Sequence, residues 1–422
     1  MLKKFTMKMF IRYALSLCIG TMLFSACDEV VTYNDGYDDG LTPYGPPVIA
    51  RITTVADTET DISTGSFNQM IVLHGENLSQ VQSLVFNDQE VDLKEIYAVN
   101  DRITVRVPGT VPDQIDDKVK LRTSKGEVAF DFKVAFPDLV IAGLSHHFAS
   151  AGEQVQLLGE NLKLYDFTPE KGQLTIGGKK AAIVACEENV LTFTVPDGVG
   201  DNSPLILSSE RMKTVTGLEE VELTYRDRGY SVLDMFADNF EALTTNDQGV
   251  SYATQGGAGG PAPLFPGAWF CRFNAVSGAY KWNYLVWQSK YQFSLPNADA
   301  LCAEILKDLS AFDFRYEILV PAEKPIAGTN HRVMVFLGRR PADANLEWLP
   351  AASGTAYHTQ GRWATVSMSG SDYLNPDGST PLKEHGNPFG IAYITGGTDL
   401  DLDVSFTNFR ICKKMSRRIS QK

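Results

Sequence analysis

The sequence predicts an all-β protein, with two small β-sandwich modules in tandem and a larger jelly-roll β-sandwich after them. Short runs of alternating apolar and polar residues recur along the chain, with turn residues about every ten positions. One of these patterns is repeated within the first half of the chain. By contrast, a single short segment of the C-terminal half, Ala298–Leu309, has the apolar spacing of an amphipathic helix.

Residues 1–26 have the layout of a signal peptide. A basic start precedes an apolar run, Tyr13–Phe24, which is too short to span a bilayer comfortably. The run ends in Ser25-Ala26-Cys27, and small residues directly before a cysteine resemble a bacterial lipobox. The resemblance implies cleavage before Cys27 and acyl chains on Cys27 as a lipid anchor. An ordinary signal peptide followed by a chance cysteine is the alternative.

Residues 27–46 are acidic, rich in Tyr and Gly, and end in prolines. They have no apolar period, which predicts a flexible acidic tether. Acidic residues directly after the acylated cysteine resemble the export signal of surface lipoproteins in glycan-foraging Gram-negative bacteria. The resemblance implies an outer-membrane protein that faces the cell exterior, and a linker facing the periplasm is the alternative.

Charge and cysteine content exclude several classes of function. The net charge of −13 argues against nucleic acid and against an anionic membrane face as partners. The basic tail, Lys413–Lys422, is the exception, and we expect it to be a solvated end. The cysteines after Cys27 have neither metal-ligand spacing nor the density of a disulfide scaffold, so we expect buried free thiols, no metal and no cofactor.

The repeat defines two modules, at 47–136 and 137–225. Residues 71–78 read Ile-Val-Leu-His-Gly-Glu-Asn-Leu, and residues 155–162 read Val-Gln-Leu-Leu-Gly-Glu-Asn-Leu. A Val-Pro pair follows later in each module, at Val107-Pro108 and at Val195-Pro196. We expect the Gly of the repeat to permit a sharp turn after the strand, and the Asn to cap that turn.

These residues resemble the IPT/TIG family of immunoglobulin-like modules. The resemblance implies two immunoglobulin-like β-sandwiches, which in surface proteins usually serve as spacers. Neither module contains a Trp, which also favours a spacer role.

The region 226–422 differs in composition, because all five Trp residues of the chain lie in it. Alternation predicts strands at Trp269–Asn274, Lys281–Trp287, Phe312–Val320, Arg332–Gly338, Arg362–Met368 and Leu402–Arg410. Many strands and little helix predict a jelly-roll β-sandwich.

One predicted strand is unusually aromatic. Tyr280, Trp282 and Tyr284 alternate along it and would share one face, because side chains on a strand alternate with a period of two. Exposed rings of this kind stack on the C–H faces of sugars. The alternative is that this face belongs to the core.

Several segments of the region resemble the C-terminal glycan-binding domain of surface glycan-binding proteins of the B type. They are Ala268–Phe273 after a Gly-rich loop, Ala279–Asn283, Phe314–Pro321, Gly361–Met368 and Phe406–Ile411. These proteins are lipoproteins of polysaccharide utilisation systems with SusC/SusD-type transporters. With the lipobox and the paired modules, the resemblance covers nearly the whole chain.

The resemblance implies a polysaccharide as ligand, an extended β-glucan or a hemicellulose-like chain. It places the stacking rings at Trp282, Tyr280 and Trp348, with Trp348 in a long loop, Arg339–Tyr357. Hydrogen bonds are expected from Asn283 and Tyr357. The expected partners are the outer membrane, a neighbouring SusC/SusD-type transporter complex and surface glycoside hydrolases.

Two other classes remain open, a jelly-roll glycoside hydrolase and a structural or adhesive surface protein. Asp399, Asp401 and Asp403 would share a strand face, as catalytic carboxylates of a hydrolase would. No nucleophile or metal motif of known enzymes occurs in the sequence, however, so no enzyme activity and no catalytic residue is predicted.

Overall fold

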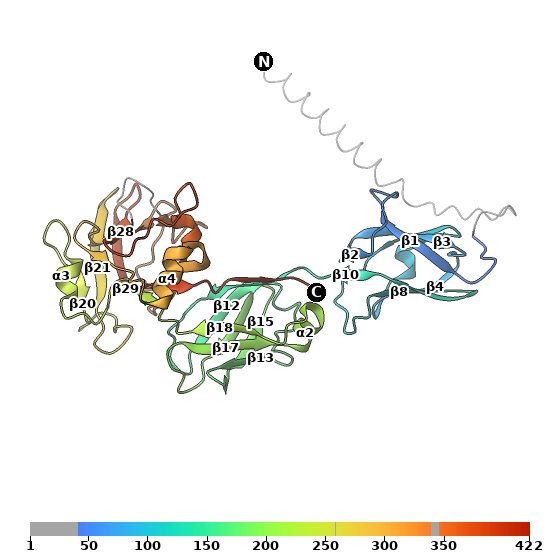
Figure 1. The fold of residues 1–422 in the computed structure, drawn as a ribbon, viewed down its shortest axis with the longest axis horizontal. Helices are drawn as coiled ribbons and strands as arrows, with labels where there is room; N and C mark the ends of the chain where they lie inside the picture. Colours follow the sequence, from blue (N-terminus) through green and yellow to red (C-terminus); the bar gives the residue numbers. More distant parts are fainter. Residues whose placement is uncertain (1–40, 258, 339–345) are drawn as a thin grey trace, which may run out of the picture. The chain divides into compact units, whose positions relative to one another are not determined.

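The computed structural model describes residues 41–257, 259–338 and 346–422 (Figure 1). Cys27 and the expected signal peptide therefore lie outside the described residues. The chain divides into two compact units, one up to Ala135 and the other from Phe136 to Lys422. Strands dominate both units, and this confirms the expected all-β class. No helix of the described part is long and apolar enough to cross a membrane.

The first unit holds one β-sandwich. Its sheets have the strand orders β1-β3-β7-β6 and β5-β4-β8-β9, and a parallel pair, β2 and β10, lies beside them. The strands are β1 (Val48–Thr54), β2 (Thr64–Ser66), β3 (Met70–Glu76), β4 (Val81–Phe86), β5 (Gln89–Glu90), β6 (Tyr97–Val99), β7 (Arg102–Arg106), β8 (Lys118–Thr123), β9 (Gly126–Asp131) and β10 (Lys133–Ala135), with a 3-10 turn at Leu93–Glu95. Alternate residues such as Leu73, Ile103 and Leu121 fill its core.

The second module opens the second unit. Its sheets have the orders β15-β16-β12-β11-β30 and β14-β13-β17-β18. The elements are β11 (Leu139–Leu144), β12 (Gln154–Glu160), β13 (Gln173–Ile176), β14 (Lys179–Lys180), β15 (Ala182–Cys186), β16 (Val190–Thr194), β17 (Ser203–Ser208), helix α2 (Glu210–Thr216), β18 (Val221–Tyr225) and, from the C-terminal tail, β30 (Arg417–Ile419).

The C-terminal tail differs from expectation. Strand β30 pairs antiparallel with β11, and Ile419 lies opposite Leu139. The tail runs from the last domain back along the second module (Figure 1). Met415 and Ile419 are buried, so the prediction of a solvated end was wrong. The prediction relied on the basic residues of the tail and overlooked the two apolar residues between them, which are buried in the structure.

The repeated motif has a clear structural reason in both modules. Gly75 lies within β3, and a Cβ there would come within 1.8 Å of the carbonyl oxygen of Val48. The matching distance is 2.1 Å for Gly159, which faces Val140. The turn itself is made by Asn77 and Asn161, both with positive φ. The Gly is thus needed for close strand approach, and the expectation that it forms the turn was wrong.

The last domain is a sandwich of two sheets. One has the order β20-β21-β29-β24-β27 with β19 beside β29, and the other β22-β28-β25-β26 with β23 beside β28. The strands are β19 (Tyr230–Ser231), β20 (Ala253–Thr254), β21 (Phe270–Ser277), β22 (Trp282–Val286), β23 (Gln292–Phe293), β24 (Phe312–Leu319), β25 (Arg332–Leu337), β26 (Leu346–Trp348), β27 (Ala364–Ser369), β28 (Asn387–Ile394) and β29 (Leu400–Lys413).

Short helices complete this domain: α3 (Phe240–Thr244), α4 (Ala300–Lys307) and 3-10 turns at Leu309–Ala311 and Gly370–Tyr373. Helix α4 confirms the expected amphipathic segment. It begins after Asp299, whose side chain accepts hydrogen bonds from two backbone N–H groups, and it buries Cys302 and Ile305. The six predicted strands are present, but the central strand β28 was not predicted.

The second module and the last domain are joined by a buried polar cluster. Arg410 and Glu317 form a two-pronged ion pair, with N–O distances of 2.7 and 3.0 Å. Both side chains are almost completely buried. The guanidinium of Arg410 also lies 4.9 Å from the ring centre of Phe148, in the second module. Together with the β11–β30 pairing, this contact explains why the two domains form one compact unit.

Candidate functional site

The outer face of the β22-β28-β25-β26 sheet carries a row of aromatic and apolar side chains. Trp282 on β22 lies opposite Ile394 on β28, and Ile394 lies opposite Arg332 on β25. Two residues further along β22, Tyr284 lies opposite Ala392. Paired residues of neighbouring strands share a face, so these side chains lie on the side away from the inter-sheet core.

The aromatic rings of this face support one another. Trp282 and Tyr284 are stacked, with ring centres 5.7 Å apart and an angle of 26° between the rings. Trp287 meets Tyr284 edge-on at 4.3 Å. Beneath them, Phe336 is buried in a small apolar cluster against which Tyr284 packs. Trp282 keeps 41% of its surface exposed, so the face presents a supported ring to solvent.

A polar pair borders the aromatic row. Arg332 and Glu347 form an ion pair of 3.3 Å, and both side chains are partly exposed. The Nε of Arg332 is buried and has no hydrogen-bond partner among the described residues. Burial raises the pKa of Tyr284, with a smaller effect from Asp247, so its hydroxyl stays protonated at neutral pH. The face therefore offers both stacking and hydrogen-bonding groups.

Tyr280 lies in the turn that connects β21 to β22. It is 76% exposed and has a φ of 56°, which is unusual for a bulky residue. Its backbone N–H donates to the carbonyl of Gly396. A Cβ on Gly397 would lie 2.8 Å from the Tyr280 hydroxyl, so the absence of a side chain there lets the ring lie across the neighbouring turn.

Asn283 points to the other side of β22 from Trp282. Its amide nitrogen donates to the Ser277 hydroxyl at 2.8 Å and to the Tyr393 carbonyl at 3.2 Å. The amide group thus links β22 to its neighbours, and the structure does not bring it together with Trp282.

Trp348 and Tyr357 also lie apart from Trp282. Trp348 stands on β26 opposite Val333, a core residue, so its expected position in a loop was wrong. Tyr357 meets Trp348 edge-on at 5.1 Å, and both pack against the main core. Burial raises the pKa of Tyr357. The structure thus separates Trp348 and Tyr357, which pack against the main core, from Trp282 on the outer face.

The remaining Trp residues of the domain have packing roles. Trp269 stacks on Phe240 at 6.0 Å. Trp363 meets Phe270 edge-on, and its ring N–H donates to the Ala262 carbonyl at 3.0 Å. Tyr284 is the residue that sequence reasoning left out of its list of ligand contacts, although its place in the alternating pattern put it beside Trp282.

The three aspartates on β29 and just before it are engaged by other groups. Asp403 accepts two hydrogen bonds from Arg272, at 2.8 and 2.7 Å. Asp401 pairs with Lys324 at 2.8 Å, and Asp399 accepts from the backbone N–H of Ala279. Within the described ranges, no group of three or more His, Cys, Asp or Glu residues is placed to hold a metal ion.

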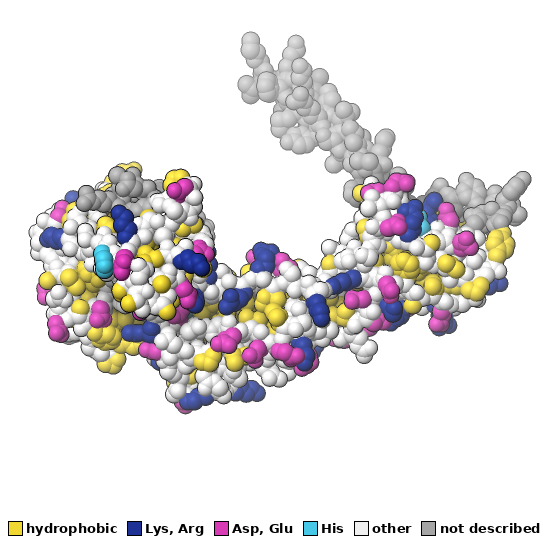
Figure 2. Space-filling model, in the orientation of Figure 1, with side chains coloured by type: hydrophobic (Ala, Val, Ile, Leu, Met, Phe, Trp, Pro, Cys, Tyr) yellow, Lys and Arg dark blue, Asp and Glu magenta, His cyan; other side chains and the backbone are white. Residues whose placement is uncertain are grey.

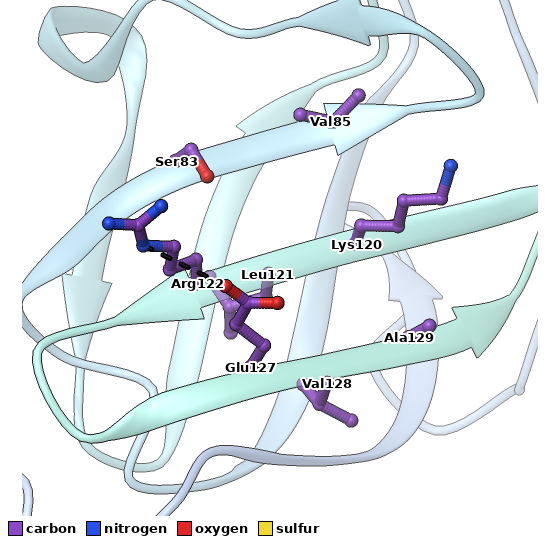
Figure 3. A pocket seen from close by; sticks show the side chains of 8 residues that line it. All are labelled: Ser83, Val85, Lys120, Leu121, Arg122, Glu127, Val128 and Ala129. Carbon is purple, nitrogen blue, oxygen red and sulfur yellow. Dashed lines mark ion pairs between the residues drawn. The ribbon is translucent and has the colours of Figure 1, made fainter.

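The first module has a shallow hollow of about 470 Å³ on its β4-β8-β9 sheet. Figure 3 shows the side chains that line it, among them Arg122 and Glu127, which pair across neighbouring strands. The described residues that line the hollow include no aromatic side chain, so they do not offer the ring surface that the last domain provides. Acidic and basic side chains are interspersed over the visible surface of the described parts (Figure 2).

The fold and this aromatic face define a class of protein, a chain of β-sandwich domains whose last domain has the features of a carbohydrate-binding domain. Residues 225–413 match the family described as the surface glycan-binding protein B xyloglucan-binding domain. This part of the chain is therefore similar to that family. No protein of curated function matches the sequence.

Two solved structures of bacterial surface glycan-binding proteins match much of the chain. The surface glycan-binding protein B of Prevotella bryantii has a TM-score of 0.56 and 18% identity, over 88% of this chain and 100% of that chain. The corresponding protein from a complex xyloglucan utilisation locus in Bacteroides uniformis has a TM-score of 0.40 and 16% identity, over 87% and 99% of the two chains. The likeness to the Prevotella protein shows a shared fold.

Proposed function

We propose that this protein binds a neutral, extended polysaccharide on the outer face of the β22-β28-β25-β26 sheet, at the bacterial cell surface. The observation that carries the proposal is the exposed ring of Trp282, which stacks on the partly buried Tyr284 in a domain that matches a xyloglucan-binding family. Xyloglucan, or another β-glucan or hemicellulose, is the ligand class that fits best.

The chemistry of the face matches such a ligand. Sugar rings present flat C–H patches, which stack on indole and phenol rings, and a rim of hydroxyl groups. Trp282 supplies the exposed ring, and Tyr284 holds it from below. Arg332 and Glu347 supply a donor and an acceptor at the border of the row. A row of side chains along a sheet face suits an extended chain better than a compact sugar.

We further propose that the rest of the chain serves to hold this face away from the membrane. Cys27 would carry the lipid anchor, residues 27–46 would be the tether, and the two modules would be spacers. We propose that the protein captures polysaccharide for a neighbouring SusC/SusD-type transporter complex and for surface glycoside hydrolases. A capture role needs no catalytic residue, and the carboxylates of the β29 region are already engaged by Arg272 and Lys324.

The test uses the chain without residues 1–27. The last domain should not be cut off at residue 226, because β30 pairs with the second module and Arg410 contacts Phe148. Native gels containing xyloglucan, mixed-linkage glucan, other hemicelluloses and host glycans would show which polymer retards the protein. Retardation by an extended β-glucan or hemicellulose is expected. If the folded protein is retarded by none, the proposal fails and an adhesive role becomes the better account.

The same samples test the hydrolase alternative. Incubation of the protein with each polymer, followed by measurement of newly formed reducing ends, should give the same value as the polymer alone. A time-dependent rise would contradict a purely binding role.

A further inference from the structure

A hollow of about 510 Å³ lies where the second module meets the last domain. Gln154 and Gln156 on β12 contribute one wall. His358, Gln360 and Arg362, in the segment before β27, contribute the other. Both walls belong to the same compact unit, and grooves between domains are common places for ligands to bind.

Two hydrogen bonds between the two domains involve Thr365, which lines the hollow. The N–H of Thr365 donates to the Ser145 carbonyl at 3.1 Å. The Thr365 hydroxyl in turn accepts from the N–H of His147 at 2.9 Å. The pairing of β11 with β30 also holds these two domains together. The backbone on both sides of the hollow is therefore held in place, and a ligand would have to order only the exposed side chains.

The lining is polar and has little charge. Among the described residues that line the hollow, none is acidic, and Arg362 carries the single permanent charge. Burial lowers the pKa of His146, with a further effect of Arg362, so this ring is neutral at pH 7. The amides of Gln154, Gln156 and Gln360 have no hydrogen-bond partner among the described residues. Each amide offers two donors and an acceptor.

This chemistry suits a chain rich in hydroxyl groups, because each hydroxyl both donates and accepts. Tyr357 also lines the hollow, and it is a residue that the sequence associated with glycan binding but that lies away from Trp282. The lining contains no Trp, so binding here would depend on hydrogen bonds.

We propose that this hollow is a second contact site for a neutral polysaccharide, separate from the aromatic face on β22. The inference rests on the proposed function, since it assumes that the protein binds a glycan. Two contact sites on one molecule would raise the apparent affinity for a long polymer relative to a short oligosaccharide.

The test compares three variants of the chain without residues 1–27, each titrated with polymeric xyloglucan. The double variant Gln154→Ala/Gln156→Ala should bind the polymer about fivefold more weakly, because each lost hydrogen bond contributes modestly. Gln173→Ala, an exposed Gln on the other sheet of the same module, is the matched control and should bind like the wild type. Trp282→Ala should lose more affinity for the polymer than either of these variants.

Hydrogen exchange gives a second readout that does not depend on the variants. Xyloglucan should slow backbone exchange in residues 154–160 and 356–364 as well as in β22. If the wild type binds, but the double variant binds equally well and protection is confined to the β22 face, the second site is overturned and the proposed function stands. If the wild type binds no polymer, both proposals fail.

Discussion

The ring of Trp282 lies stacked against that of Tyr284, 5.7 Å from centre to centre, and Trp287 closes the other side of Tyr284 edge-on at 4.3 Å. Tyr284 is thus the middle ring of a row of three. Its position holds the exposed indole at a fixed angle on the sheet. A preorganised ring loses little conformational freedom when a ligand stacks on it.

Removing the ring of Tyr284 should therefore weaken glycan binding, because Tyr284 supports the ring of Trp282. Tyr284→Ala is expected to lower the affinity for xyloglucan about tenfold, since buried aromatic anchors carry much of the binding energy of a site. Tyr284→Phe keeps the ring and should bind like the wild type. Isothermal titration of the two variants checks this, and equal affinity of Tyr284→Ala and Tyr284→Phe would contradict the supporting role.

The buried ion pair of Glu317 and Arg410 should matter for stability. Glu317→Gln leaves the Arg410 charge buried without a counter-charge, which is expected to cost about 3–5 kcal/mol of unfolding free energy. Urea unfolding followed by circular dichroism measures it. The matched control is Asp131→Asn, which breaks the exposed pair with Lys118 and should change the midpoint little. Equal midpoints for both variants would show that the buried pair does not stabilise the junction.

The C-terminal strand gives another stability test. Deletion of residues 416–422 removes β30, and with it the burial of Ile419 against the second module. Full burial of an Ile side chain stabilises by about 1.5–3 kcal/mol, so the thermal midpoint should fall clearly. Arg418→Ala, which loses only an exposed ion pair with Asp138, should have a small effect. An unchanged midpoint after the deletion would mean that β30 does not pair in solution.

His147 predicts a pH dependence of stability. It is buried, and burial together with the positive Arg315 and Arg410 lowers its pKa well below the usual value of 6.5. Because the folded-state pKa is below the unfolded one, stability is kept above about pH 6.5 and decreases as the pH falls below it. The slope is at most about 1.4 kcal/mol per pH unit.

The variant His147→Gln stays neutral at every pH and isolates this effect. Unfolding midpoints between pH 7.5 and 5 should fall more steeply for the wild type than for the variant. Parallel pH profiles would show that His147 is not the titrating group.

The sequence was informative where local pattern decides the structure. The Gly-Glu-Asn-Leu repeat predicted two related modules because strand approach and the left-handed turn are local requirements of Gly75 and Asn77. Alternation placed Trp282 and Tyr284 on one face of β22 in the same way. The apolar spacing of Ala298–Leu309 predicted helix α4.

The sequence was less informative where the register between distant strands decides the structure. Whether Trp348 faces the core depends on its pairing with Val333 across β25 and β26, and a shift of one residue would turn it to the other face. Strand β28, which aligns Ile394 between Trp282 and Arg332, is a nearly continuous apolar run without alternation. Strand β30 pairs with a partner almost 280 residues away, and no local rule predicts such a contact.

The most direct test of the account is the affinity of the Trp282→Ala variant for polymeric xyloglucan, measured by isothermal titration beside the wild type. Tyr97→Ala, which removes an exposed ring in the first module, serves as the control. We expect Trp282→Ala to lose about 2 kcal/mol or more, roughly a thirtyfold loss of affinity, with an unchanged unfolding midpoint. Wild-type affinity in the folded Trp282→Ala variant would contradict the placement of the binding face on β22.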